Sequence, residues 1–284
     1  MRALVIGSSL TAITMFAACS LTTDLEGLSG GVDATDSSVG PLPIVEAGSL
    51  SEASPPTDAP VETGTGNAYA DLVLADGPAA YYRFEDPVGS NAASDELGKI
   101  PANLTGAGVT FGSDGVVGHA ALFDGNSALD LGDVFDFAGQ VPFTLELWAK
   151  STTSNLGGLL MHKRDEHTGN SADFVGYVLY LDNATPHFEA WGVDLSAWND
   201  TADPAGFVHL AVAVSYATGK GNATLYVNAL PAMHGGFDNT LDLADTPTHL
   251  TFGSTFNGLI DEVAIYTKAL PPDRVIAHYR AGKP

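Results

Sequence analysis

Short runs in which hydrophobic and polar residues alternate recur through the last three quarters of the chain. In the run 143–149, Phe, Leu, Leu and Ala occupy the odd positions, and Thr, Glu and Trp occupy the even ones. In the run 207–214, Val and Leu residues alternate with positions that include His209. A period of two is typical of strands that bury one face. Both runs are therefore predicted to be β-strands with one face in a core.

The runs 176–181, 223–227 and 259–266 have a similar β-rich composition. Clusters of Gly, Asn, Asp and Ser separate the runs, as in 124–127 and 217–222. Many short strands joined by turns, with almost no helical periodicity, favour two packed antiparallel sheets. The predicted fold class is therefore all-β, a two-sheet antiparallel sandwich.

One helix is expected, close to the carboxyl end. Pro272 fits the first helical turn, where its missing N–H costs nothing. Val275, Ile276 and Tyr279 then share one face, and Gly282 suits the end of the helix. This short C-terminal helix is predicted to cover one edge of the sandwich.

The first 18 residues are predicted to be a signal peptide. Arg2 is their one charged residue, and an apolar run too short to span a membrane follows it. The run ends in Phe16-Ala-Ala-Cys19, which resembles a bacterial lipobox, although Leu is usual where Phe16 stands. Cys19 is therefore the predicted lipidation site, and the alternative is a plain secretory peptide with an incidental Cys. Because Ser20 stands where retention at the inner membrane would call for Asp, we expect an outer-membrane protein of the bacterial cell envelope.

Residues 19–66 are predicted to be a disordered acidic linker. From Ser20 to Gly66 there are 8 acidic residues and no Lys or Arg, and 25 of the 47 positions are Gly, Ser, Thr or Pro. Such a stretch buries too little apolar surface to offset the entropy of ordering it. Its flexible reach would be roughly 35–40 Å. The folded domain is expected to occupy residues 67–284.

Composition excludes several classes of partner and site. The 284 residues carry a formal net charge of −23 and contain one Cys. One Cys excludes an intramolecular disulfide framework and multi-Cys metal sites. The negative charge disfavours nucleic acid and anionic bilayer surfaces, which would repel the protein. Membrane contact is therefore expected through the lipid anchor alone.

Four motifs occur in order along the chain: Tyr69-Ala-Asp-Leu-Val-Leu-Ala-Asp-Gly-Pro-Ala-Ala-Tyr-Tyr-Arg-Phe-Glu85, Gly118-His-Ala-Ala-Leu-Phe-Asp-Gly125, Phe143-Thr-Leu-Glu-Leu-Trp148 and Phe256-Asn-Gly-Leu-Ile-Asp-Glu-Val-Ala-Ile-Tyr266. Together they resemble the laminin-G-like (concanavalin A-like) jellyroll domains of bacterial secreted proteins. The resemblance extends over nearly all of 69–279 and implies a jellyroll sandwich. The fold hosts lectins, adhesins, sugar-binding modules and glucanases alike, so it does not fix a function.

No catalytic residue is predicted. Some relatives cleave β-glucans with a Glu-x-Asp-x-x-Glu strand, because hydrolysis needs a pair of carboxylates. No Glu-x-Asp triplet occurs in this chain. His162 and His167 flank the charged run 163–166 at a spacing that fits no common zinc pattern. We expect that run to be a solvated loop.

The resemblance implies one structural calcium ion, since domains of this kind often hold one. Carried onto the matching motifs, its ligands would be Asp124 and Asp261. Calcium prefers several oxygens from carboxylates and turn carbonyls. The alternative is that Asp124 shapes its own turn by bonding nearby amides. Asp261 or Glu262 would then pair with a local cation.

Carbohydrate binding is the commonest assignment in the family. Aromatic faces with a few fixed polar groups make a specific sugar site. Glu146, Trp148, Trp191 and His209 are expected to share one outward sheet face, and Trp198 to lie at its rim. In the alternative, Trp148 and Trp191 are core residues or cover a sheet.

The sequence therefore favours a surface-tethered, non-catalytic binding module whose partner is a polysaccharide or glycoconjugate. The alternative is a structural or protein-interaction domain of the envelope, with an envelope protein as partner and no sugar site. A cluster of exposed aromatic side chains on one sheet face would favour the first interpretation.

Overall fold

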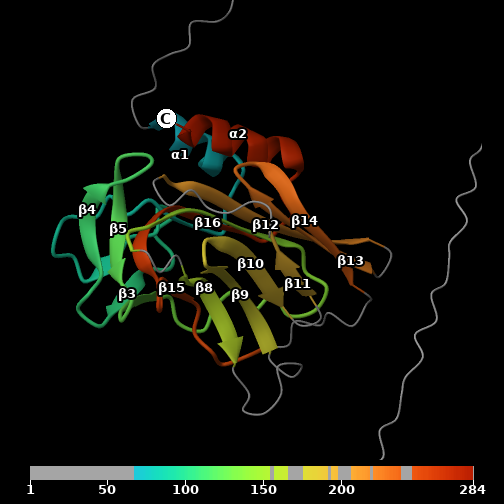
Figure 1. Ribbon diagram of the computed structural model, residues 1–284, viewed down its shortest axis with the longest axis horizontal. Coiled ribbons are helices and arrows are strands. Elements are labelled where there is room, and N and C mark those ends of the chain that lie inside the picture. The colour runs from blue at the N-terminus through green and yellow to red at the C-terminus, as the bar shows by residue number, and fades with distance from the viewer. Residues whose placement is uncertain are drawn as a thin grey trace, which may run out of the picture. The chain divides into compact units, whose positions relative to one another are not determined.

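The computed structural model describes residues 67–153, 157–165, 175–190, 193–197, 206–217, 220–237 and 245–283. These residues form two antiparallel β-sheets and two helices (Figure 1). The signal peptide, Cys19 and the linker predicted for residues 19–66 lie outside the described residues. In the described ranges, no helix has the length and apolar character needed to cross a bilayer.

The first sheet, sheet I, has eight strands in the order β14-β13-β12-β7-β16-β5-β4, and β1 pairs with part of β16. Its long central strands are those that the alternating pattern predicted. The strands are β1 (Ala80–Tyr82), β4 (Thr110–Asp114), β5 (His119–Asp124), β7 (Phe143–Ser151), β12 (Val208–Ala217), β13 (Lys220–Val227), β14 (Leu230–Phe237) and β16 (Asn257–Tyr266).

The second sheet, sheet II, also has eight strands, in the order β11-β10-β9-β8-β15-β6-β3-β2. It contains the predicted run 176–181 as part of β9. The strands are β2 (Ala92–Ala93), β3 (Ala102–Thr105), β6 (Ala128–Asp130), β8 (Gly158–Asp165), β9 (Val175–Asp182), β10 (Thr185–Ala190), β11 (Val193–Ser196) and β15 (Thr251–Phe252).

The main core lies between the two sheets and confirms the predicted sandwich. Phe143, Leu145 and Leu147 of β7 face it, as the period of two requires. On sheet II, Leu179 of β9 and Phe188 of β10 face the same core. The fold class, with a short C-terminal helix, is therefore as the sequence predicted.

A second core covers the outer face of sheet I. Helix α1 (Asn67–Ala75) contributes Tyr69 and Val73, and helix α2 (Pro272–Gly282) contributes Val275. These side chains pack on Trp148 and Tyr266 of the sheet. Figure 1 shows both helices lying together on one side of the sandwich. The sequence predicted one helix, but the structure has two, and α1 is the additional one. Helix α2 was expected to cover an edge of the sandwich, but it covers the outer face of sheet I.

Helix α2 begins at Pro272, as predicted, and ends at Gly282. Gly282 has a further role that the sequence did not reveal. A Cβ atom at this position would lie 2.7 Å from the Trp148 ring and 3.0 Å from the Tyr69 ring. Such distances are too short for carbon atoms, so glycine allows the last turn of the helix to approach the sheet.

Candidate functional site

Three of the predicted ligand-binding residues lie together on the outer face of sheet I. Glu146 and Trp148 are on β7, and His209 on β12 pairs directly with Trp148. Their common face is as predicted. All three side chains are buried, however, with exposed fractions of 0%, 2% and 0%.

Helices α1 and α2 cause this burial. The Trp148 ring stacks on Tyr279 of α2 at 5.7 Å between centroids, and its Nε1 donates a hydrogen bond to Tyr69 Oη of α1 (3.1 Å). Aromatic rings packed in this way belong to a core. The prediction that Glu146, Trp148 and His209 form a ligand-binding surface is therefore wrong, because two helices occupy the face on which a ligand would lie.

Glu146 is the centre of a buried polar network. Its Oε1 lies 2.8 Å from His209 Nε2, and its Oε2 lies 2.9 Å from His278 Nδ1. Tyr266 Oη also donates to Oε2, at 3.3 Å. Burial opposes ionisation of a carboxyl group, but the two histidines outweigh it and lower the pKa of Glu146 to about 2.

The network continues into the helices through His278, which the sequence reasoning did not select. Its Nε2 lies 2.9 Å from Asp76 Oδ2, and Asp76 also bonds Arg274 Nε at 2.7 Å. Burial works against protonation of His278, yet Glu146 and Asp76 raise its pKa. His278 follows Val275 by three residues on the apolar face of α2, a position at which burial could have been anticipated. The network fastens the helices to the sheet.

The other predicted ligand-binding residues, Trp191 and Trp198, lie outside the described residues. In the sequence, Trp191 comes directly after the last residue of β10, and Trp198 comes two residues after the last residue of β11. Their role stays a prediction.

Asp124 does what the alternative interpretation expected. It is exposed, and its Oδ1 accepts a hydrogen bond from the Asn126 N–H (2.9 Å) in the turn that follows β5. This bond lowers the pKa of Asp124. The carboxylate therefore stabilises its own turn.

Asp261 lies in β16, four residues after Asn257, the residue that pairs with Asp124. Four residues of strand span about 13 Å, so the two predicted calcium ligands do not form one site. Asp261 is buried, and its Oδ2 accepts hydrogen bonds from the N–H groups of Val116 (2.7 Å) and Val117 (3.2 Å). The bound calcium ion stays a prediction, but these residues do not fit one as a pair.

Glu262, next to Asp261, pairs with a local cation, as the alternative also expected. Its Oε1 lies 3.3 Å from Arg83 Nε, and Tyr81 donates a hydrogen bond to its Oε2. Burial raises the pKa of Glu262 to about 7 even though Tyr81 and Arg83 act in the other direction. Burial and the charge of Glu262 together raise the pKa of Asp261.

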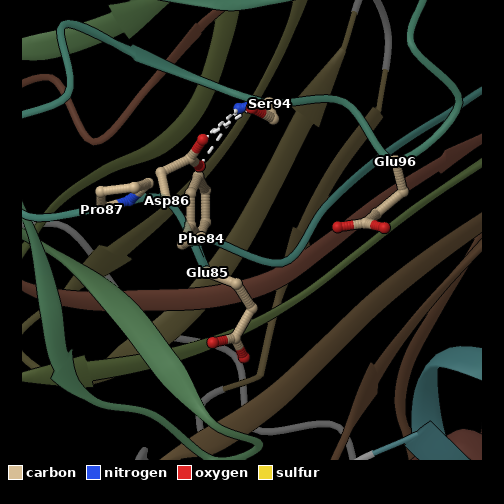
Figure 2. A pocket seen from close by; sticks show the side chains of 6 residues that line it. All are labelled: Phe84, Glu85, Asp86, Pro87, Ser94 and Glu96. Carbon is tan, nitrogen blue, oxygen red and sulfur yellow. Dashed lines mark hydrogen bonds between the residues drawn. The ribbon is translucent and has the colours of Figure 1, made fainter.

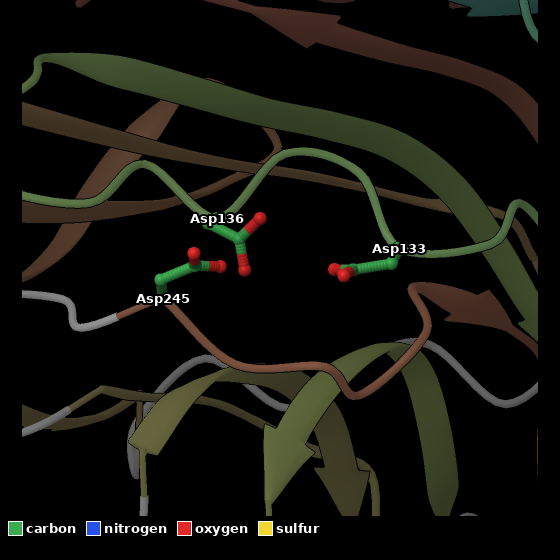
Figure 3. A group of neighbouring side chains, drawn as sticks. All are labelled: Asp133, Asp136 and Asp245. Atoms are coloured by element: carbon green, nitrogen blue, oxygen red, sulfur yellow. The ribbon is translucent and has the colours of Figure 1, made fainter.

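A group of three carboxylates lies at one end of the core. Asp133 and Asp136, from the segment between β6 and β7, lie near Asp245, and their oxygens are within 4.8 Å of one another (Figure 3). Lys163 Nζ lies 2.8 Å from Asp133 and 3.0 Å from Asp136. Lys163 is fully buried in β8, so the expectation of a solvated loop over 163–166 is wrong at this residue.

A pocket of about 260 Å³ lies beside the segment that follows β1 (Figure 2). Both carboxylate oxygens of Asp86 accept hydrogen bonds from the Ser94 N–H (3.1 Å each). Glu85 Oε2 lies 2.8 Å from His119 Nδ1. With three carboxylates, this pocket suits hydroxyl groups or cations better than anions. Its lining residues are Phe84, Glu85, Asp86, Pro87, Ser94 and Glu96.

The outer face of sheet II carries a different polar cluster, and no described helix packs against it (Figure 1). Tyr180 of β9 and His187 of β10 pair across the strands, with ring centroids 4.8 Å apart and planes 14° from parallel. Glu189 accepts hydrogen bonds from Tyr180 Oη (2.5 Å) and from an Arg164 guanidinium nitrogen (2.6 Å). The side chains of Arg164 and Glu189 are 18% and 22% exposed.

Comparisons with solved structures agree with this architecture. Domain 4 of an extracellular arabinanase from Geobacillus stearothermophilus, in complex with arabinotriose, matches with a TM-score of 0.55 at 21% identity. The match covers 71% of this chain and 98% of that one. The binding domain of Paraclostridial Mosquitocidal Protein 1 matches with a TM-score of 0.55 at 18% identity, over 72% of this chain and 52% of that one.

A mutant Trypanosoma rangeli sialidase with trans-sialidase activity matches with a TM-score of 0.54 at 14% identity. The match covers 75% of this chain but 34% of the sialidase chain. At these identities the likenesses show the fold, and the neighbours with this fold include binding domains.

No curated protein sequence is significantly similar to this chain. A family model, in contrast, matches residues 123–276, more than half of the chain. The matched region extends from the end of β5 into α2 and contains the central strands of both sheets. The chain therefore belongs to the concanavalin A-like lectin/glucanases superfamily.

Proposed function

We propose that the domain is a non-catalytic module that binds a carbohydrate or glycoconjugate on the outer face of sheet II. The observation that carries this proposal is the contrast between the two outer faces. Sheet I is covered by α1 and α2. On the described part of sheet II, Arg164, Tyr180 and Glu189 are partly exposed, His187 is buried beside Tyr180, and no described helix lies above them.

The chemistry of this cluster suits a sugar. A pyranose or furanose ring offers an apolar face for stacking and hydroxyl groups around its edge. The partly exposed Tyr180 ring supplies a flat surface, and its stacking on His187 fixes its orientation. Glu189 and Arg164 supply an acceptor and several donors for hydroxyl groups. Planar side chains whose positions are set by neighbours lose little entropy on binding.

The comparisons support a sugar ligand without identifying it. The arabinanase domain that resembles this chain was solved in complex with arabinotriose, and another similar structure is the binding domain of a toxin. Each of these two structures is one domain of a larger protein. A binding role for this domain is consistent with both.

The carboxylates of the outer face of sheet I, of β16 and of the group beside Lys163 are placed in a way that supports a non-catalytic role. Glu146, Asp261 and Glu262 are fully buried, so a substrate cannot reach them in this arrangement. Asp133 and Asp136 are bound by Lys163. Hydrolysis of glycosides needs two carboxyl groups that flank an accessible bond.

We further propose that Cys19 carries the lipid that anchors the protein in the bacterial outer membrane, and that residues 20–66 act as its tether. Several acyl chains on one residue would hold the protein firmly, since each buried methylene contributes about 0.8 kcal/mol. Replacement of Cys19 by Ser should release the protein from the membrane fraction. Its retention there would contradict the anchor.

A glycan array probed with the purified protein tests the binding proposal. We expect Arg164→Ala and Tyr180→Ala to weaken binding of the best glycan at least about tenfold, or roughly 1.4 kcal/mol. Tyr180→Phe should retain stacking and lose the bond to Glu189, so its effect should be smaller. Trp191→Ala and Trp198→Ala test the remaining predicted ligand contacts in the same assay.

Lys99→Ala is the matched control, since Lys99 is an exposed cation outside sheet II. It should leave binding unchanged. If no glycan binds the wild-type protein, the sugar site is refuted and the protein-interaction alternative is favoured. If a glycan binds but the Arg164 and Tyr180 variants bind it equally well, the site lies elsewhere. Release of reducing sugar from the bound glycan would refute the non-catalytic role.

A further inference from the structure

Lys163 lies in an environment that resembles the ligand shell of a metal ion. Its Nζ lies 2.8 Å from Asp133 Oδ1, 3.0 Å from Asp136 Oδ1 and 2.7 Å from the carbonyl oxygen of Thr248. The carbonyl oxygen of Thr246 is a fourth contact, at 3.3 Å. Two carboxylates and two backbone carbonyls are the oxygen ligands that a hard cation such as calcium prefers.

The position of Lys163 in its strand explains how the ammonium group reaches these oxygens. Lys163 pairs with Tyr177 of β9, whose side chain faces the core, so Lys163 also points inward. Its side chain is 0% exposed. A buried charge without partners is very costly, and the surrounding oxygens provide the partners.

The same oxygens connect two segments that are distant in the sequence. Asp133 and Asp136 follow β6, whereas Thr246 and Thr248 precede β15. The Thr246 N–H also donates to Asp136 Oδ1, at 3.2 Å. The Lys163 ammonium group therefore joins β8 to the segment after β6 and to the segment before β15. A structural metal ion joins distant segments in the same way in many domains.

A divalent ion and Lys163 cannot use these oxygens together. Calcium binds its ligands at about 2.3–2.6 Å. An ion that close to Asp133 Oδ1 and Asp136 Oδ1 would lie in or beside the volume of the ammonium group, and the two positive charges would repel one another. The third carboxylate, Asp245, is within 4.8 Å of the other two and would complete a calcium site if the ammonium group were absent (Figure 3).

We propose that Lys163 is the resident cation of this site and that it excludes a divalent metal from it. The ammonium group performs the structural task of the ion, so this part of the domain is independent of calcium. Removal of the amine should turn the three carboxylates and two carbonyls into a calcium site that the natural protein does not have.

Calcium titration by calorimetry tests this proposal. Lys163→Met keeps the apolar stem of the side chain and removes the ammonium group. We expect this variant to bind one more calcium ion per chain than the wild-type protein. Its thermal midpoint should be lower than that of the wild type in a chelator and should rise with added calcium. Asp245→Asn in the Lys163→Met background should abolish the additional site.

Lys99→Met is the control for a lost surface amine, and its calcium stoichiometry should equal that of the wild type. If Lys163→Met folds and binds no additional ion, the proposal is wrong. If that variant does not fold even with calcium, the same titration is made on Asp245→Asn in the wild-type background. If Asp245→Asn binds as many calcium ions as the wild-type protein, the proposal that the Lys163 ammonium group occupies the site is supported. If Asp245→Asn binds one calcium ion fewer, the proposal is wrong.

Discussion

Replacement of Glu146 by Gln is the sharpest test of how the helices are held on sheet I. The change keeps the size of the side chain and removes the charge that faces His209 and His278. The pKa of Glu146 falls from the ordinary 4.5 to about 2 in the folded protein. At about 1.4 kcal/mol per pKa unit, this difference corresponds to about 3 kcal/mol of stability. Removal of one partner from a buried ion pair costs a similar amount, about 3–5 kcal/mol.

The sign of the pH dependence follows from the two pKa changes. A carboxyl group with a lowered pKa stabilises the fold above its unfolded value of 4.5, and this stabilisation is lost as the pH falls toward 2. His278 has a raised pKa, so its contribution is complete below its unfolded value of 6.5 and is lost as the pH rises through the folded value. The stability difference between wild type and Glu146→Gln should therefore be largest between pH 4.5 and 6.5.

Thermal denaturation followed by tryptophan fluorescence over a pH series measures this difference. For a domain of this size, about 3 kcal/mol should lower the thermal midpoint by about 6–12 °C. Glu96→Gln, a change at an exposed carboxylate, should stay within about 0.5 kcal/mol of wild type. If the Glu146→Gln deficit is the same at low pH as at pH 6, or if the variant is as stable as wild type, the ion-pair account of helix docking is wrong.

Two further changes test other parts of the fold. Because burial and Glu262 raise the pKa of Asp261, the folded protein holds a proton that the unfolded chain releases, and stability falls as the pH rises. Asp261→Asn should therefore gain stability relative to wild type in thermal melts as the pH rises above the unfolded value of 3.8, and a constant difference would contradict the raised pKa. Gly253 has a φ of +74°, and a Cβ there would lie 2.1 Å from the Phe123 ring, so Gly253→Ala should cost about 1–3 kcal/mol more than Gly77→Ala. Gly77 has a φ of +62° with open space around it, so equal denaturation midpoints for the two variants would refute the steric argument.

The alternating pattern predicted which way side chains point, because a strand offers two faces and a sandwich buries one of them. Leu145 faces the main core and Glu146 faces outward, as the period of two requires. The pattern could not show what lies above the outward face. The covering helix α1 brings Tyr69 and Val73 onto the sheet, and their spacing of four residues is the one signal in the sequence that favoured a helix there.

Buried charges were the least predictable feature, because their burial depends on partners distant in the sequence. Lys163 lies in a charged run that is typical of a solvated loop, yet its partners come from segments about 30 and 83–85 residues away. Glu146 similarly depends on His278, 132 residues further along the chain. Local periodicity carries no information about contacts at such separations. The sequence therefore singled out Glu146 without its role and did not single out Lys163 or His278.

The two outer faces also differ in the free-energy cost of replacing a carboxylate's partner by a ligand. Glu146 and Glu189 are both outward carboxylates held by two or more donors, but Glu146 is fully buried and Glu189 is 22% exposed. A ligand that took a partner from Glu146 would leave a buried charge unpaired, at a cost of about 3–5 kcal/mol. Exchange of a partner of Glu189 with sugar hydroxyls should cost less than this, because the carboxylate is 22% exposed and water can replace part of the lost interaction. Loss of a partner is therefore less costly for Glu189 than for Glu146, which supports the proposal that a ligand binds on the outer face of sheet II rather than on that of sheet I.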